Sequence, residues 1–354
     1  MKHLLMMTAA SFAVTATGAL AGGIERSSQS VGVLFEEGTY GEFTFSTVSP
    51  SVSGTFAGAI PSGDMAASYQ NYSFSYKQDI GSNLSFALIL DQPVGANVAY
   101  PSAGGYPFAG STATVDSHAV TGFLRYKLPN NVSFYGGLRA QSVTADLNVI
   151  AQAPLPAVVN YNLHIGSDIA YGYAVGVAYE KPEIALRVAL TYNSEITHSL
   201  PDNAGTPFDV TIPKSWNLEF QSGVAKDTLV FGSIRWVEWT AFRIAPADYL
   251  AGVLADGKTD TTAYTLGVGR KFNDNWSGAI ILGYEGAGGV PVGNLGPTDG
   301  YRSIGLAATY KVNNVKITGG IRYIDIGDTT TTSIGSSFTG NNAIGVGVKV
   351  GINF

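Results

Sequence analysis

The histidines are the side chains of this chain best suited to metal binding or acid–base chemistry. The sequence has four histidines and no cysteine, which excludes disulfides, thiolate metal sites and cysteine nucleophiles. His118, His164 and His198 lack the i, i+4 spacing of a helical zinc site. Ser117 precedes His118, but adjacent residues of a strand point to opposite faces, and the sequence has no G-x-S-x-G elbow. We therefore expect no metal, no cofactor and no enzyme activity.

Apolar residues gather in two segments that otherwise resemble long polar connections. In the second segment, i, i+4 pairs predict a short amphipathic helix over Asp248 to Ala255. Exposed apolar patches mark binding sites, so one interpretation is a groove for a hydrophobic ligand and the other is a lid of loops that pack on each other. The candidate ligand-binding residues are Val149, Ile150, Leu155, Val158 and Val159 in the first segment and Tyr249, Leu250, Val253 and Leu254 in the second.

Alternating apolar and polar residues predict the strands that must position these groups. From Ile344 to Phe354, apolar side chains occupy one parity, while glycines, Lys349 and Asn353 occupy the other. A lipid-facing strand around a watery lumen has this period of two. The same pattern recurs near 84–90, 169–179, 184–192, 304–312 and 315–323. Several lysines and arginines lie on the predicted lumen face, where they could hold a ligand carboxylate or form an ordinary wet lining.

Short and long connections alternate along the chain, as they do in outer-membrane barrels. Six short and seven long connections predict an all-β, transmembrane antiparallel barrel of about fourteen strands with both ends in the periplasm. Aromatic residues at the strand ends are typical of the two girdles of such a barrel. The short turns are expected near 79–83, 129–131, 181–183, 225–227, 273–275 and 313–314, and the long loops near 50–65, 92–116, 146–167, 197–208, 243–261, 285–299 and 325–341.

Composition and the N-terminus agree with an exported membrane protein. Only 13% of the residues are charged, and the net charge of -6 gives no reason to bind nucleic acid. Met1 to Ala21 has the charged start, the apolar stretch and the small-residue end of a secretory signal peptide. Downstream there is no apolar run of about 20 residues, so a closed barrel is the remaining way to span a membrane.

Four motifs, in a fixed order along the chain, carry a family resemblance. They are Ala189 to Glu195, Pro213-Lys214-Ser215-Trp216, Trp236 to Phe242, and Phe272 to Trp276. On these motifs the chain resembles the FadL-like family of outer-membrane long-chain fatty-acid and hydrocarbon transporters. The resemblance implies a fourteen-stranded barrel over 39–354 and an N-terminal plug over 22–38. It also implies capture of a ligand by apolar external loops and its lateral exit where the third strand kinks.

The kink of the third strand matches Asp91 to Asn97, with Gly95 on the kink glycine. Pro93 cannot donate to a strand ladder and Gly95 weakens one, so a break in pairing is also expected on physical grounds. The plug is shorter than usual in the family and lacks its N-P-A segment. Val149 stands where the family has a basic pocket residue, and Arg139 and Arg243 are nearby substitutes.

The expected function is passive transport of long-chain fatty acids or similar hydrophobic compounds across the outer membrane of a Gram-negative bacterium. Besides the ligand, the expected partners are outer-membrane lipid and lipopolysaccharide, and the expected state is a monomer. The alternative is a general diffusion porin for small polar solutes, which would have an open lumen with charged constriction rings. A barrel enzyme or adhesin would need a convergent catalytic set or long polar loops, and neither is evident.

Overall fold

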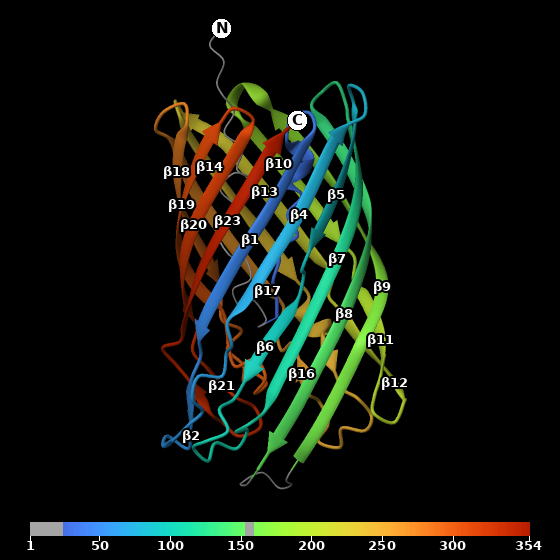
Figure 1. Cartoon of the computed structure of the whole chain (residues 1–354), viewed down its shortest axis with the longest axis vertical. Coiled ribbons are helices and arrows are strands. Elements are labelled where there is room, and N and C mark those ends of the chain that lie inside the picture. Colours follow the sequence, from blue (N-terminus) through green and yellow to red (C-terminus); the bar gives the residue numbers. More distant parts are fainter. Residues whose placement is uncertain (1–23, 153–158) are drawn as a thin grey trace.

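The strands of the computed structural model, which describes residues 24–152 and 159–354, wrap into one closed barrel (Figure 1). Within these residues, fourteen antiparallel strand positions form the wall, and β5 and β6 share the third position. The ladder between β1 and β23 closes the sheet. The predicted fold class is therefore confirmed. The wall strands are β1 (Tyr40–Ser51), β4 (Tyr69–Asp79), β5 (Leu84–Asp91), β6 (Gly95–Ala99), β7 (Thr112–Lys127), β8 (Val132–Ala151), β9 (Val159–Lys181), β10 (Leu186–Asn193), β13 (Ser215–Ala225), β14 (Thr228–Val237), β17 (Thr261–Lys271), β18 (Trp276–Glu285), β19 (Tyr301–Val312), β20 (Val315–Ile326) and β23 (Asn342–Asn353).

The alternation of side chains along each strand turns one face to the outside of the barrel and the other to its interior. On β23, Ile344, Val346 and Val348 are exposed, whereas Lys349 is buried. The outward faces of the other strands are likewise rich in large apolar side chains. Since a lipid bilayer solvates such a surface, the exposed apolar band is the membrane-facing side of the wall.

All six predicted short turns are present, and they gather at the end of the barrel that holds the C-terminus (Figure 1). Asn131, Asp227 and Asn313 adopt φ values of 66°, 57° and 52° in three of these turns. Asparagine and aspartate tolerate this left-handed conformation better than other residues with a Cβ atom, because their short polar side chains bond the local backbone.

The long connections at the opposite end carry short strands of their own. They are β2 (Gly54–Phe56), β3 (Ile60–Pro61), β21 (Thr329–Thr330) and β22 (Ser337–Phe338) in one small sheet, β11 (Ile196–Pro201) with β12 (Pro207–Ile212), and β15 (Arg243–Ile244) with β16 (Ala255–Asp256). Three 3-10 turns complete the elements of residues 24–152 and 159–354: η3 (Gly32–Phe35), η4 (Pro182–Ile184) and η5 (Trp239–Ala241). No helix in the described ranges is long and apolar enough to cross a membrane.

The prediction of a long loop over Asp146 to Ser167 was wrong for most of these residues. β8 and β9 continue as a paired ladder to Ile150↔Asn160 and beyond. Alternation persists in this extension: Leu147 and Val149 are buried on the inner side, whereas Asn148 is not. Leu147 and Val149, which looked misplaced in a loop, therefore line the inside of the barrel extension.

The amphipathic helix predicted over Asp248 to Ala255 was also wrong. Two successive turns replace it, with the N–H of Tyr249 donating to the carbonyl of Pro246 and the N–H of Gly252 donating to that of Tyr249. Gly252 adopts a φ of 103°, and Ala255 pairs with Ile244 in a strand. Neither conformation is compatible with a continuous helix.

The N-terminal segment, which we define as Ile24 to Thr39, contacts the inner face of the wall. Lys77 Nζ donates to the carbonyl of Glu36 at 2.8 Å, and Arg125 Nη1 donates to that of Leu34 at 2.9 Å. Val31 to Phe35 form an apolar cluster with inward side chains of the wall strands. A second, larger cluster lies among the long connections. The predicted signal peptide, Met1 to Ala21, lies outside the described residues.

Candidate ligand pathway

An apolar cavity lies among the long connections at the mouth of the barrel, and we call it the mouth cavity. Its volume is about 570 Å³. A cavity of this size can hold a small hydrophobic ligand. Its apolar wall comes from three separate connections and from the extension of β8: Phe108, Val149, Leu250, Val253, Leu254 and Leu295.

Five of the candidate ligand-binding residues meet at this cavity. One of them, Val149, comes from the first segment. The other four come from the second segment, about 100 positions further along the sequence: Tyr249, Leu250, Val253 and Leu254.

The other candidates lie elsewhere. Ile150 is on the opposite face of β8 from Val149, and Arg243 is exposed on β15. Arg139 is buried deeper in the barrel. Leu155, Val158 and the side chain of Val159 lie outside the described residues.

Polar contacts hold the connection that carries Tyr249 and Leu254. The hydroxyl of Tyr161 donates to Asp248 Oδ1 at 2.6 Å, and Asn203 Nδ2 donates to Asp248 Oδ2 at 2.9 Å. The Tyr161 hydroxyl, together with the Asn203 donors, holds the pKa of Asp248 below its usual range. The rings of Tyr161 and Tyr249 lie 4.9 Å apart, so the loop is tied to the extension of β9 at the cavity wall.

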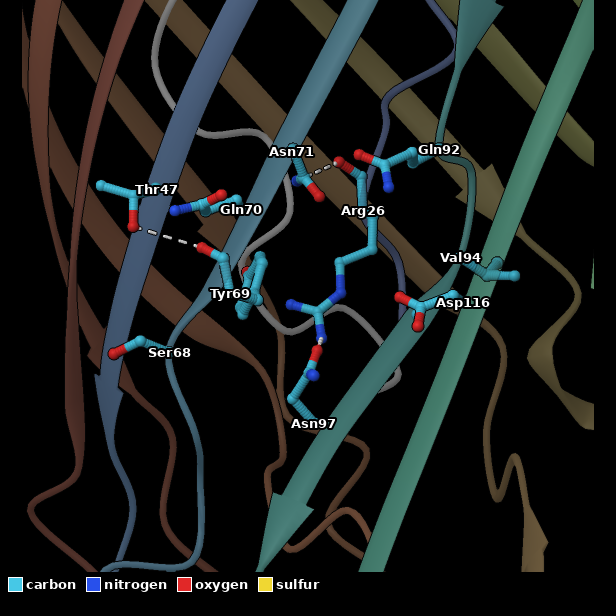
Figure 2. A pocket seen from close by; sticks show the side chains of 11 residues that line it. Arg26, Thr47, Ser68, Tyr69, Gln70, Asn71, Gln92, Val94, Asn97 and Asp116 are labelled. Carbon is cyan, nitrogen blue, oxygen red and sulfur yellow. Dashed lines mark hydrogen bonds between the residues drawn. The ribbon is translucent and has the colours of Figure 1, made fainter. Parts of the chain in front are cut away.

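Strand pairing in the wall of the barrel is interrupted at the third strand position, where Pro93 and Gly95 lie between β5 and the body of β6. β4 pairs with β5 only between Phe74↔Leu90 and Asp79↔Ser85, and beyond this point β6 does not rejoin it as a ladder. A cavity of about 320 Å³ occupies the break, and we call it the wall cavity (Figure 2). Its lining is mainly polar: Arg26, Thr47, Ser68, Tyr69, Gln70, Asn71, Gln92, Val94, Gly95, Asn97 and Asp116.

Arg26 of the N-terminal segment reaches into the wall cavity from the inside (Figure 2). Its Nη2 donates to Asn97 Oδ1 at 3.0 Å, and its guanidinium carbon lies 3.2 Å from the centre of the Tyr69 ring. The backbone of this segment pairs with Val94 on the rim. A Cβ atom on Gly95 would lie 3.0 Å from the Val115 carbonyl oxygen and 3.1 Å from Arg26 Nε. Glycine at this position therefore permits the close approach.

On the outer face, one hydrogen bond spans the break from β4 to β7. The Tyr72 hydroxyl lies 2.8 Å from His118 Nε2, and both side chains are exposed. Ser117, the neighbour of His118, points inward, where its hydroxyl donates to the carbonyl of Val94. The two side chains thus point to opposite faces, as predicted. Two further histidines of the described residues pair with acids, His164 with Asp146 and His198 with Asp168.

Arg139 is engaged by the protein itself. Its Nε donates to Thr121 Oγ1 at 2.8 Å, its Nη1 to Gln29 Oε1 at 3.0 Å and its Nη2 to Asn193 Oδ1 at 3.2 Å. One of these partners belongs to the N-terminal segment. In this arrangement the guanidinium ties that segment to the wall.

Comparisons with known proteins agree on this architecture. A family model described as outer membrane protein transport protein (OMPP1/FadL/TodX) matches residues 41–285. The chain belongs to this family. The solved structure of a Pseudomonas aeruginosa FadL homologue matches with a TM-score of 0.73 at 12% identity, over 91% of this chain and 92% of that one. The Pseudomonas putida toluene transporter TodX matches with a TM-score of 0.69 at 12% identity, over 95% and 98%. No curated protein matches the sequence.

Membership of the OMPP1/FadL/TodX family places the protein in the outer membrane as a transport protein. Outer-membrane barrels have short periplasmic turns and longer external loops, and on this rule we assign the end with the long connections to the outside. The general diffusion porin is not favoured, since the family model describes a different class of transport protein.

Sequence reasoning missed most of the residues around the wall cavity. The sequence around Arg26 has no recognisable motif, and the position of its side chain depends on how the N-terminal segment folds inward. Gln70 and Thr47 did carry a signal, because they stand at the outward parity of strands whose other outward residues are aromatic, such as Phe45 and Phe74. Polar residues at lipid-facing positions indicate a break in the apolar surface.

Proposed function

We propose that the protein transports long-chain fatty acids or similar hydrophobic compounds across the outer membrane by passive diffusion. The mouth cavity carries this proposal, because apolar side chains at an external mouth can take a hydrophobic ligand from water. We assign capture to Val149, Tyr249, Leu250, Val253 and Leu254, and leave Leu155, Val158 and Val159 as candidates next to them. The matched solved structures include toluene transporters, which supports a hydrophobic cargo.

The charges along the pathway favour an uncharged compound over a carboxylate. Arg139 already donates to three groups of the protein. Lys258 at the mouth cavity forms an ion pair with Asp256 at 2.7 Å. Arg243 is exposed and does not line the cavity. A fatty-acid carboxylate would have to displace one of these contacts.

We propose that the ligand leaves sideways through the wall cavity at Pro93 and Gly95. Release into the bilayer avoids exposing the ligand to periplasmic water, which costs about 0.8 kcal/mol per CH₂ group. The N-terminal segment would act as the plug, within a mature chain that runs from Gly22 and has its barrel over 39–354. We further propose that the protein works as a monomer in outer-membrane lipid and lipopolysaccharide, and that it is a transporter without enzyme activity.

A reversible crosslink across the break tests the lateral exit. The chain has no cysteine, so a Tyr72→Cys/His118→Cys variant offers one thiol on each side of the wall cavity. A short bis-methanethiosulfonate reagent should then lower uptake of a labelled hydrocarbon by cells, and a reductant should restore it. The matched control is Tyr264→Cys/Tyr284→Cys, on the facing strands β17 and β18 away from the break.

Binding to the purified protein tests the cargo separately. A long-chain fatty acid and its alcohol should both bind, the alcohol at least as tightly. If neither binds and the protein instead conducts small sugars, the proposed function is wrong. If ligands bind but the crosslink leaves uptake unchanged, only the lateral exit is wrong.

A further inference from the structure

A second, smaller cavity adjoins the mouth cavity, and we call it the inner cavity. Its volume is about 80 Å³. The two cavities are adjacent, because five residues line both of them: Leu254, Asp256, Lys258, Gly293 and Leu295. Ile24 of the N-terminal segment also lines the inner cavity. A ligand that spans both cavities would place one end in the inner cavity and its remainder in the mouth cavity.

Three side chains of the inner cavity carry a buried atom that has no hydrogen-bond partner in the described part of the chain. They are the indole Nε1 of Trp239, the carboxyl Oε2 of Glu285 and the hydroxyl Oγ1 of Thr298. Trp239 and Glu285 are each 2% exposed, and all three residues line the cavity. Leaving a buried polar group unpaired costs about 1–3 kcal/mol, so unpaired groups at one small cavity point to a missing partner.

The other acids near this cavity are already engaged. Asp299 accepts hydrogen bonds from the N–H groups of Gly288 and Gly289, and Asp256 pairs with Lys258. Glu25 of the N-terminal segment accepts from Arg235 Nε at 2.6 Å. Glu285 differs from all three because one of its oxygens remains unused.

The chemistry of Trp239 and Glu285 selects the partner, because the third unpaired atom, the Thr298 hydroxyl, can either donate or accept. An indole N–H only donates, whereas a carboxyl group accepts and, when protonated, also donates. An ammonium group would satisfy Glu285 but has nothing to offer Trp239. A ligand carboxylate would satisfy Trp239 but would lie next to the carboxyl groups of Glu285 and Asp299, and two carboxyl groups at one site disfavour a further negative charge. A hydroxyl group both donates and accepts, and so it can satisfy both.

We propose that the inner cavity is a recognition site for the hydroxyl group of an uncharged amphiphile, a phenol or an alcohol, with Trp239 as the donor and Glu285 as the acceptor. This proposal rests on the proposed function, since the apolar part of the ligand occupies the mouth cavity. Phe242, Val292 and Leu254 line the inner cavity around the polar pair. Such a site makes the protein bind hydrophobic compounds that carry a hydroxyl group more tightly than those that do not.

Calorimetric binding of two matched probes to the full-length protein in detergent tests the proposal, with detergent alone as the blank. The probes are 4-butylphenol and 4-butyltoluene, which differ by a hydroxyl in place of a methyl. We expect the phenol to bind about tenfold more tightly. Trp239→Phe and Glu285→Met should each remove most of that preference, with little change for 4-butyltoluene. The 4-butylbenzoate anion should bind most weakly.

Two variants control for changes unrelated to the cavity. Trp216→Phe alters an exposed outward tryptophan, and Glu183→Gln alters an exposed acid beside a short turn. Both should keep the tenfold preference. Heat-modifiable migration on a gel checks that every variant has folded, and a misfolded Glu285→Met leaves Trp239→Phe as the deciding variant.

The outcomes separate this proposal from the proposed function. The wild type and the variants could all bind 4-butylphenol and 4-butyltoluene equally tightly. That result would mean that only water occupies the inner cavity. It would leave the proposed transport function standing and refute the hydroxyl site. Preferred binding of the benzoate would refute it as well. Binding of none of the probes would overturn the proposed function and the hydroxyl site together.

Discussion

Replacing Arg235 with methionine should release the N-terminal segment from the wall of the barrel. Arg235 Nε lies 2.6 Å from Glu25 Oε1, and Arg235 Nη1 also donates to Ser215 at 3.0 Å and to Asn217 at 2.6 Å. Glu25 and Arg235 are both buried. The substitution would leave the Glu25 carboxyl without its cation, near the carboxyl of Glu285.

The expected size of this effect follows from that burial. Removing one partner of a buried ion pair costs about 3–5 kcal/mol, because the other charge remains in a poorly solvating environment. If the whole cost falls on the docked state, the population with the segment released rises by about 150- to 5,000-fold. A Glu25→Gln/Arg235→Met double variant should regain most of the loss, since it leaves no unpaired buried charge.

Trypsin cleavage after Arg26, followed by intact-mass spectrometry, measures this population. Arg26 is buried while the segment is docked, so cleavage reports release when opening and closing are fast. Arg270→Met removes an exposed arginine of β17 and should cleave at the wild-type rate. A cleavage rate for Arg235→Met within twofold of wild type would refute the reasoning, and so would a double variant that is cleaved as fast as the single one.

Three further results are expected. Leu254→Asp should weaken hydrocarbon binding at least tenfold in a calorimetric titration, because it places a charge at a position 7% exposed that lines both cavities. Leu250→Asp should weaken binding less, because Leu250 is 97% exposed and the new charge stays in water. Because the pKa of Asp248 is lowered in the fold, its loop contact should be fully present above about pH 4 and be lost as the pH falls through the lowered value. Near-UV circular dichroism should show that transition, and Asp248→Asn should abolish it. Gly176→Ala should destabilise the barrel by about 1–3 kcal/mol in a denaturant titration, since the new Cβ would lie 2.3 Å from Tyr135 Cζ.

The sequence by itself determined the barrel, because side-chain parity in a strand is a local property. Residues such as Ile344 and Val346 must share a face whatever the rest of the chain does. The short turns were equally local, since Asn131 and Asn313 have the backbone freedom that such turns need. Pro93 and Gly95 disrupt pairing through their own backbone chemistry, so the break in the third strand was also visible in the sequence.

Two local predictions nevertheless went wrong where tertiary pairing competed with a sequence pattern. The i, i+4 spacing around Tyr249 predicted a helix, but Ala255 pairs with Ile244 and Gly252 turns the chain. The alternation of short and long connections predicted a loop near 146–167, but the ladder between β8 and β9 continues through Val149. In both cases the energy of strand pairing depends on a partner segment that no local window contains.

Only the tertiary structure decided which residues form the cavities. Val149 meets Leu254 at the mouth, and Trp239 meets Glu285 at the inner cavity, because barrel closure brings strands and connections that are distant in the sequence to one place. The course of the N-terminal segment had the same origin: Arg26 reaches Asn97, and Glu25 reaches Arg235, across the interior of the closed barrel. Contacts of this kind depend on the shape of the whole wall, whereas the alternation that builds the wall is encoded residue by residue.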